Sequence, residues 1–232
     1  MTASLLVVTG LQREAQIAAG HGVVTLCSGG NPQLLRKRLD KHFSTRLGSE
    51  VGGILSFGLA GGLSPDLHSG DIVIATHVIA EGRRNKAHAD WIRTIVAAFD
   101  DELRVHRGAM AGSNLVLTRS ADKADLHEAT RAIAVDMESH IAAEYARGHN
   151  LPFAAIRAIS DPASRGLPEI ASNALRPDGS VDVMKVMSGV LRGPGQVPAL
   201  IAAGIDSNRA FASLRRCRGL LGPLFGLGGP HL

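Results

Sequence analysis

The sequence has few of the residues on which several protein classes depend. Its 232 residues include two cysteines, Cys27 and Cys217, which lie far apart. Aromatic residues make up 3% of the chain, and its ten histidines show no HxH or HExxH spacing typical of metal sites. No signal-peptide pattern precedes the first apolar run. We therefore expect a cytoplasmic protein without disulfides, without a metal and without a bound cofactor.

The charge of the chain also bears on its partners. The formal net charge is +4, and the basic residues cluster near residues 36–38, 83–86 and 215–218. A basic chain can attract nucleic acid or an anionic membrane. Because so few aromatic residues are present to stack on bases, we expect no nucleic-acid partner.

The apolar pattern predicts an α/β fold. Apolar residues make up 45% of the chain, enough for a packed core. Strand-like runs alternate with helix-favouring stretches, an order typical of a largely parallel sheet. These runs span 5–9, 23–27, 54–57, 72–79 and 153–159. We expect one domain over 1–207, with three α/β/α layers around a central mixed, largely parallel sheet, and a basic amphipathic tail over 208–232.

Glycines follow the first two predicted strands. Thr9-Gly10 leads into a helix with Glu14 in its first turn, where an acid also simply favours the helix dipole. The second strand is followed by Ser28-Gly29-Gly30, with Pro32 beginning the next helix. Free amides there could bind phosphate or a ribose hydroxyl, and an ordinary tight turn is the alternative.

Three further glycines lie within residues 58–62, directly after a buried run. We expect a small loop there that brings main-chain amides, including those of Ala60 and Gly61, against a sugar or a planar base. The segment does not spell GxGxxG, which argues against a dinucleotide-binding domain.

Two acidic residues stand at the ends of one strand-helix-strand unit. Glu138 follows a short apolar segment, Asp161 follows the run 153–159, and residues 139–148 between them favour a helix. In an open parallel sheet both acids would lie near the carboxyl edge, where ligands bind. Two carboxyl groups facing one pocket can act as one charged and one protonated group, which suits cleavage of a glycosidic bond. Because Asp161 directly precedes a proline, helix capping is its alternative role.

The acid near the leaving group must keep its proton near neutrality. Burial raises the pKa of a carboxyl, and Arg157 would oppose that rise for Asp161 if it lay close. Glu138 should stay ionised. If Asp136 and Glu138 both lie on the following helix, their spacing of two keeps them off one face, so we expect Glu138 to point inward.

Four motifs together resemble the purine nucleoside phosphorylase and nucleosidase superfamily. They are GLAGGL at 58–63, GDIVIA at 70–75, AVDMES at 134–139 and RAISD at 157–161. The nearest relatives by this resemblance are the methylthioadenosine/S-adenosylhomocysteine nucleosidases. Further segments resemble the hopanoid-associated phosphorylase branch of this superfamily. They are SGGN at 28–31, VDMESH at 135–140, SDPA at 160–163 and the segment from Leu167-Pro168 to Pro198. Members of that branch are implied to remove adenine from adenosylhopane.

The resemblance implies a role for each matching residue. Asp161 matches the acid that protonates the purine at N7, with Ser160 in support. Glu14 matches the base that activates water. Glu138 matches the carboxylate that binds the ribose hydroxyls, and Met137 an apolar contact under the sugar. The resemblance also implies a substrate-binding group of Ala60, Gly61, Leu115 and Val116, and a nucleophile or phosphate pocket of Ser28, Gly29 and Gly30.

The chain departs from the family pattern in two places. Nucleosidases commonly stack an aromatic ring on the base, where this chain has Leu115. We therefore expect weaker affinity for the base. Phosphorylases place an arginine four residues after the first glycine turn, whereas Glu14 takes that place here and Arg13 lies one position short. This difference favours water over phosphate as the nucleophile.

We therefore expect an enzyme that releases adenine from a 5'-substituted adenosine, with adenosylhopane as the leading substrate. A phosphate-dependent phosphorylase with phosphate as co-substrate and a methylthioadenosine/S-adenosylhomocysteine nucleosidase are alternatives. A nucleoside-binding or membrane-associated module without catalysis is a third. The family further implies at least a dimer.

The tail from Asn208 onward mixes arginines with apolar residues up to Gly222-Pro223. It predicts a short basic amphipathic helix, too short to span a bilayer. Our hypothesis is that this helix rests on an anionic membrane, where a substrate with a lipid tail would reside. Packing of the helix on its own domain, or at an oligomer contact, is the alternative.

Overall fold

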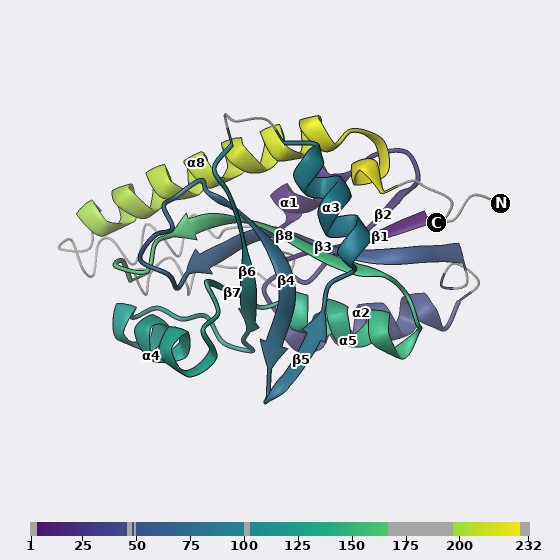
Figure 1. The fold of residues 1–232 in the computed structure, drawn as a ribbon, viewed down its shortest axis with the longest axis horizontal. Coiled ribbons are helices and arrows are strands. Elements are labelled where there is room, and N and C mark those ends of the chain that lie inside the picture. The colour runs from purple at the N-terminus through teal and green to yellow at the C-terminus, as the bar shows by residue number, and fades with distance from the viewer. Residues whose placement is uncertain (1–3, 46–47, 49, 100–102, 167–196, 228–232) are drawn as a thin grey trace.

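A mixed sheet organises the fold, and helices cover both of its faces (Figure 1). The computed structural model describes residues 4–45, 48, 50–99, 103–166 and 197–227. The eight strands found in these residues are β1 Ser4–Thr9, β2 Val23–Cys27, β3 Val51–Gly62, β4 Ile72–Ala80, β5 Arg83–Lys86, β6 Val105–Gly112, β7 Ala134–Asp136 and β8 Phe153–Asp161.

The strand order confirms a mixed, largely parallel sheet. The order is β2-β1-β3-β7-β6-β4-β5, and β8 pairs with both β3 and β4. β1 is parallel to β2 and β3, β8 is parallel to β3, and β6 is parallel to β4 and β7. The antiparallel pairs are β3–β7, β4–β5 and β4–β8. Because β8 joins β3 to β4, the strands β3, β7, β6, β4 and β8 form a closed ring, which the sequence did not predict.

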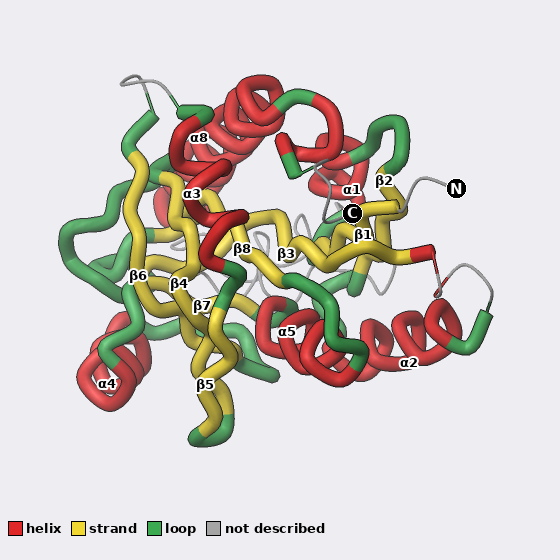
Figure 2. Tube along the Cα trace, turned by 45° about the vertical axis from the view of Figure 1, so that its right-hand side comes forward, coloured by secondary structure: helices red, strands yellow, loops and turns green. Residues whose placement is uncertain are grey.

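Helices form the two outer layers, as Figures 1 and 2 show. On one side lie α1 Gln12–Ala18, α3 Ala89–Ala97 and α8 Val197–Leu221, which pack on the sheet in one apolar cluster together with the short 3-10 helix η3 Pro223–Gly226. On the other side lie α2 Pro32–Phe43 and α5 Ser139–Gly148, which share a second cluster. The remaining helix of the described chain, α4 Ser120–Thr130, contacts a smaller cluster.

Strand β8 contributes to both layers of the core. Ala154, Ile156 and Ala158 belong to the cluster under α8, whereas Phe153 and Ile159 belong to the cluster under α5. This alternation follows from the period of two along a strand. Arg157 interrupts the apolar run, and its side chain is fully buried. A charged residue in such a place needs charged partners, so it marks a buried polar site.

The predicted loop at 58–62 is wrong, because these residues form the end of β3. The glycines are explained by close side-chain approach. A Cβ atom on Gly58 would lie 2.6 Å from both the Glu14 carboxyl carbon and Arg157 Nη1. A Cβ atom on Gly61 would lie 3.0 Å from Asp161 Oδ2. Gly58 and Gly61 therefore make room in a strand for the charged groups of the site.

The C-terminal helix belongs to the domain core. α8 runs without a break across the predicted boundary between residues 207 and 208. Its inward side chains are buried in the core, together with Phe225 of η3. They are Ala210, Phe211, Leu214, Cys217 and Leu221. The alternative of packing on its own domain is thus what the structure has. Residues 167–196, which carried part of the resemblance, lie outside the described residues. No helix among the described residues has the length and apolar composition needed to cross a membrane.

The packing of α8 leads to a stability prediction. Leu214 is fully buried, so Leu214→Ala should lower the free energy of unfolding by about 2–5 kcal/mol through lost burial and a cavity. Leu220 on the same helix is exposed, and Leu220→Ala should change it by less than about 0.5 kcal/mol. Denaturant unfolding of both variants measures this. Equal effects would mean that α8 does not pack as described.

Candidate active site

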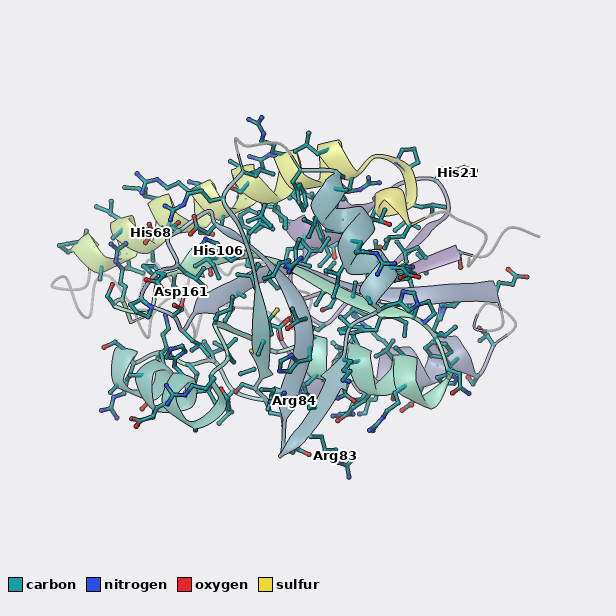
Figure 3. The ribbon with its side chains drawn as sticks, in the orientation of Figure 1. His21, His68, Arg83, Arg84, His106 and Asp161 are labelled. Atoms are coloured by element: carbon teal, nitrogen blue, oxygen red, sulfur yellow. The ribbon has the colours of Figure 1, made fainter. Side chains whose placement is uncertain are left out.

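One cavity of about 210 Å³ gathers most of the predicted site residues. It lies between the turn after β1, the ends of β3 and β8, and the segment that joins β7 to α5. Figure 3 labels one of its lining residues, Asp161, below the N-terminal half of α8. The predicted residues that line the cavity are Glu14, Gly30, Ala60, Gly61, Leu115, Val116, Met137, Glu138, Ser160 and Asp161. Residues not predicted to line it include Asp136 and Lys123.

Two predicted residues, Ser28 and Gly29, do not line this cavity. Ser28 is buried behind it, and its hydroxyl donates a hydrogen bond of 2.8 Å to Glu138 Oε1. Gly29 and Gly30 have φ values of 64° and 69°, which glycine adopts without strain. Pro32 begins α2 as predicted. This turn therefore reaches the cavity through Gly30 and through the hydroxyl that fixes Glu138.

Glu14 is held by three backbone amides. Its Oε2 accepts hydrogen bonds from the amides of Gly10 at 2.7 Å and Leu11 at 2.8 Å, and its Oε1 accepts one from Leu59 at 2.8 Å. The side chain thus joins the start of α1 to β3. Burial raises the pKa of the Glu14 carboxyl, while Arg157 and the three amides oppose the rise. A fixed carboxylate with a raised pKa is suited to take a proton from water.

Arg157 is the cation that Glu14 shares with two other acids. Its Nη2 lies 2.6 Å from Asp136 Oδ2, and its Nη1 lies 3.5 Å from Glu138 Oε2. Its Nη2 also donates to Ser56 Oγ at 2.5 Å. One guanidinium thus serves three buried carboxyl groups. Their charges exceed that of the arginine, which favours keeping protons on some of them.

Glu138 points inward as predicted, but the reasoning from helical spacing does not apply, because Asp136 points inward as well. Asp136 ends β7 and Glu138 is the N-cap residue of α5, so neither lies within the helix and helical spacing does not separate them. Both are buried against Arg157. Burial raises the pKa of Glu138 to about 7, with Asp136 and Glu14 adding to the rise and Arg157 opposing it. Burial and the neighbouring acids therefore favour the protonated form of Glu138, and the charge of Arg157 favours its ionised form.

Asp161 lies in a second charged group. Its Oδ1 accepts a hydrogen bond of 2.6 Å from Ser160 Oγ, and its Oδ2 lies 2.5 Å from Lys123 Nζ. Burial raises the pKa of the Asp161 carboxyl, as expected, but the cation that opposes the rise is Lys123 and not Arg157. Lys123 stands in a charged stretch, Asp122-Lys123-Ala124-Asp125, so nothing in the sequence distinguished it from a surface lysine.

The arrangement separates three acids into two groups that differ in their cation. Glu14 and Glu138 share a guanidinium on one side, and Asp161 pairs with an ammonium on the other, yet all three line the same cavity.

His140, which had no expected role, is buried with its Nε2 lying 3.2 Å from Asn114 Oδ1. Within the described ranges, no group of three or more His, Cys, Asp or Glu residues is arranged to hold a metal ion.

The shared guanidinium leads to a prediction about pH. Arg157→Met leaves three buried carboxyl groups without a cation and should lower the free energy of unfolding by about 3–5 kcal/mol near neutral pH. Burial already raises the pKa values of Glu14 and Glu138, and without Arg157 these two values rise further in the folded state. The folded protein binds more protons than the unfolded chain, so the loss should grow as pH rises from 5 to 8.

The control is Arg36→Met, which removes a partly exposed ion pair with Glu144 at 2.7 Å. It should cost at most about 1 kcal/mol at either pH. Urea unfolding at pH 5 and pH 8 measures both variants. A loss for Arg157→Met that shrinks as pH rises would contradict the shared-cation description.

Comparisons with known proteins agree with this fold. Residues 17–180 match the phosphorylase superfamily. No curated protein matches the chain. A Helicobacter pylori 5'-methylthioadenosine/S-adenosylhomocysteine nucleosidase is similar in structure, with a TM-score of 0.69 at 13% identity over 97% of this chain and 98% of that chain.

Two further solved structures are similar. One is the nucleosidase of the same name from Colwellia psychrerythraea in complex with adenine, with a TM-score of 0.63 at 17% identity, over 81% of this chain and 96% of that one. The other is from Streptococcus pneumoniae, with a TM-score of 0.61 at 16% identity, over 91% and 98%. At these identities the likeness concerns the fold, whereas the superfamily match covers most of the sequence. The chain therefore belongs to the phosphorylase superfamily, which confirms the superfamily and the enzyme class that its four motifs predicted.

Proposed function

We propose that this protein cleaves the N-glycosidic bond of a 5'-substituted adenosine and releases adenine, with water as the nucleophile. The observation that carries the proposal is the presence of Glu14 and Asp161 in one cavity, where Arg157 acts on the charge of Glu14 and Lys123 forms an ion pair with Asp161. Cleavage of this bond leaves a negative charge on the base and a positive charge on the sugar. A site with separate acid and base groups can stabilise both.

On the leaving-group side, Asp161 gives its proton to the purine N7. Its raised pKa supports this role, because a buried carboxyl holds a proton closer to neutrality. Ser160 and Gly61 lie beside it, and the missing side chain of Gly61 leaves room for the carboxyl. As the C1'–N9 bond lengthens, the proton neutralises the departing base.

On the sugar side, Glu138 accepts hydrogen bonds from the ribose hydroxyls and stabilises the cation through its charge. Ser28 fixes one carboxyl oxygen, and Arg157 favours the ionised form. Met137 lines the cavity next to it and supplies an apolar contact to the sugar. Glu14 takes a proton from the attacking water.

The charges around the cavity favour water over phosphate. Among the described residues that line it, Lys123 is the one with a cationic side chain. Its ammonium already forms an ion pair with Asp161. Arg13, the nearest candidate in sequence for a phosphate ligand, instead places its guanidinium 4.1 Å from the centre of the Phe211 ring. A phosphate dianion would thus meet carboxylates without a free cation.

The outer part of the site leaves room for a large 5'-substituent. Its lining is part apolar and part polar, the polar residues being Asn31, Gln33, Arg36, Glu81 and Asn114. A second hollow of about 660 Å³ shares Gly30, Leu115, Val116 and Met137 with the cavity. Leu115 is 75% exposed, which leaves an apolar side chain at this opening. Adenosylhopane remains our leading substrate on this basis, and methylthioadenosine or S-adenosylhomocysteine the alternative.

The burial of the α8 side chains bears on how a lipid-linked substrate would arrive. The apolar residues that the tail hypothesis assigned to lipid are used inside the domain. We therefore assign the entry of a lipid tail to the opening at Leu115 and Val116 and not to α8. The expectation of at least a dimer stays a prediction.

The role of Asp161 is tested by Asp161→Asn. The amide keeps the shape of the side chain but cannot give up a proton, so adenine release should fall by about 10²- to 10⁴-fold. Asp122→Asn on α4, whose carboxyl is 42% exposed, should keep the wild-type rate. Chromatography of adenine measures both variants, with circular dichroism as the check on folding. A folded Asp161→Asn enzyme with near-normal turnover would refute the assigned role.

The nucleophile is tested by assaying methylthioadenosine and adenosylhopane with and without phosphate. Because the cavity offers no free cation to phosphate, we expect equal adenine release in both buffers and a free sugar as the second product. Formation of a sugar 1-phosphate, with release that depends on phosphate, would establish a phosphorylase instead.

A further inference from the structure

A fully buried lysine stands behind the acid of the proposed reaction. Besides Asp161 Oδ2 at 2.5 Å, Lys123 Nζ contacts the main-chain oxygens of Asp161 at 3.3 Å, Pro162 at 3.1 Å and Arg165 at 2.9 Å. An ammonium has three donors and no acceptor. Four oxygen atoms around one amine, one of them in a carboxyl group, therefore hold it in the charged form.

These contacts assign different parts to the two carboxyl oxygens of Asp161. Oδ2 faces a group that can only donate, so this oxygen accepts and carries no proton. Oδ1 accepts the hydrogen bond of Ser160 Oγ at 2.6 Å when the carboxyl is ionised, and the same hydroxyl can accept instead when Oδ1 carries a proton. The proton that Asp161 can transfer is therefore the one on Oδ1.

We propose that Lys123 is a positioning residue for the leaving-group acid: it fixes Oδ2, leaves Oδ1 to the base, and stabilises the carboxylate that forms as the proton leaves. The inference rests on the proposed function. In the step itself, the O–H bond at Oδ1 breaks and the N7–H bond forms. The electron pair of the C1'–N9 bond passes into the base, the oxygen of the attacking water bonds to C1', and Glu14 accepts the proton that this water loses. Asp161 ends as a carboxylate beside the ammonium of Lys123.

The surroundings of Asp161 explain why a cation is needed there. Burial favours the neutral acid, and Asp206 on α8 adds to this effect. The carboxylate of Asp206 is paired with Arg165 and lies 3.9 Å from Arg209, so these arginines do not serve Asp161. An acid whose carboxylate is unstable transfers its proton poorly. Lys123 is the cation that contacts Asp161 and makes the transfer favourable.

A purely structural role is the competing explanation. Through its contacts with main-chain oxygens, Lys123 ties α4 to the segment after β8, and losing those contacts could lower activity without any change in the acid. The two explanations differ in pH dependence. Only a residue that stabilises the carboxylate moves the pH at which activity is lost.

The experiment compares the wild type with Lys123→Met and Lys123→Arg in the pH dependence of kcat/KM for adenine release. In Lys123→Met the carboxyl keeps its proton to higher pH, so the alkaline limb should move up by about one pH unit or more. The maximal rate should fall roughly tenfold or more, since the acid is weaker. Lys123→Arg should keep the wild-type limb. Should Lys123→Met not fold, Lys123→Gln replaces it with the same expectation.

The matched control is Lys86→Met on β5, an exposed lysine, which should change neither the rate nor the limb. An unmoved alkaline limb in Lys123→Met or Lys123→Gln, with only a lower rate, would overturn the inference.

A second measurement needs no substrate. In protein labelled with ¹³C in its aspartate carboxyls, the Asp161 signal is assigned by its loss in Asp161→Asn and titrated by NMR. Its midpoint should rise in Lys123→Met. If the midpoint rises in Lys123→Met but the wild-type protein releases no adenine, the proposed function alone is refuted. Adenine release with an unmoved midpoint would refute the role of Lys123 alone.

Discussion

The site and the core depend on one buried guanidinium. Arg157 stands within the apolar run of the central strand β8. A guanidinium does not lose its proton in proteins, so a charge lies inside the core. Its charge is tolerated because Asp136, Glu138 and Ser56 approach it from β7, from the start of α5 and from β3. The same contacts fix Asp136 and Glu138 at the cavity, on the side that we propose faces the sugar. The geometry of the site is therefore part of the packing of the fold.

The second feature of the site is the separation of its charges. Several carboxyl groups lie around Arg157 on one side of the cavity. On the other side, Asp161 forms an ion pair with Lys123. Burial raises the pKa of Glu14, Glu138 and Asp161 alike, but different cations oppose the rise. In the proposed reaction, these different partners let one set of carboxyl groups act on the sugar and another act on the base. This follows the general pattern in which environments, and not residue types, assign acid and base roles.

Local patterns predicted the elements of this fold well, and contacts across the sheet poorly. The strand 23–27, the helix 139–148 and the start of α2 at Pro32 were predicted from spacing and turn residues. The glycines of 58–62 were misread as a loop, because their reason lies in side chains that approach from elsewhere in the chain. Lys123 was missed for the same cause. The boundary at 207 failed because α8 buries its apolar face against the sheet, which its sequence alone does not distinguish from a membrane-binding face.

The closed ring of strands also has a kinetic consequence. Strand β8 fits between β3 and β4, and the hydrogen bond from Arg157 to the Leu59 carbonyl joins residues 98 positions apart. Such non-local pairing carries a large loop-closure entropy and slows folding relative to folds built from neighbouring segments. The chain must therefore close this long loop before the arginine meets its acids, so the site cannot assemble before this distant pairing is made.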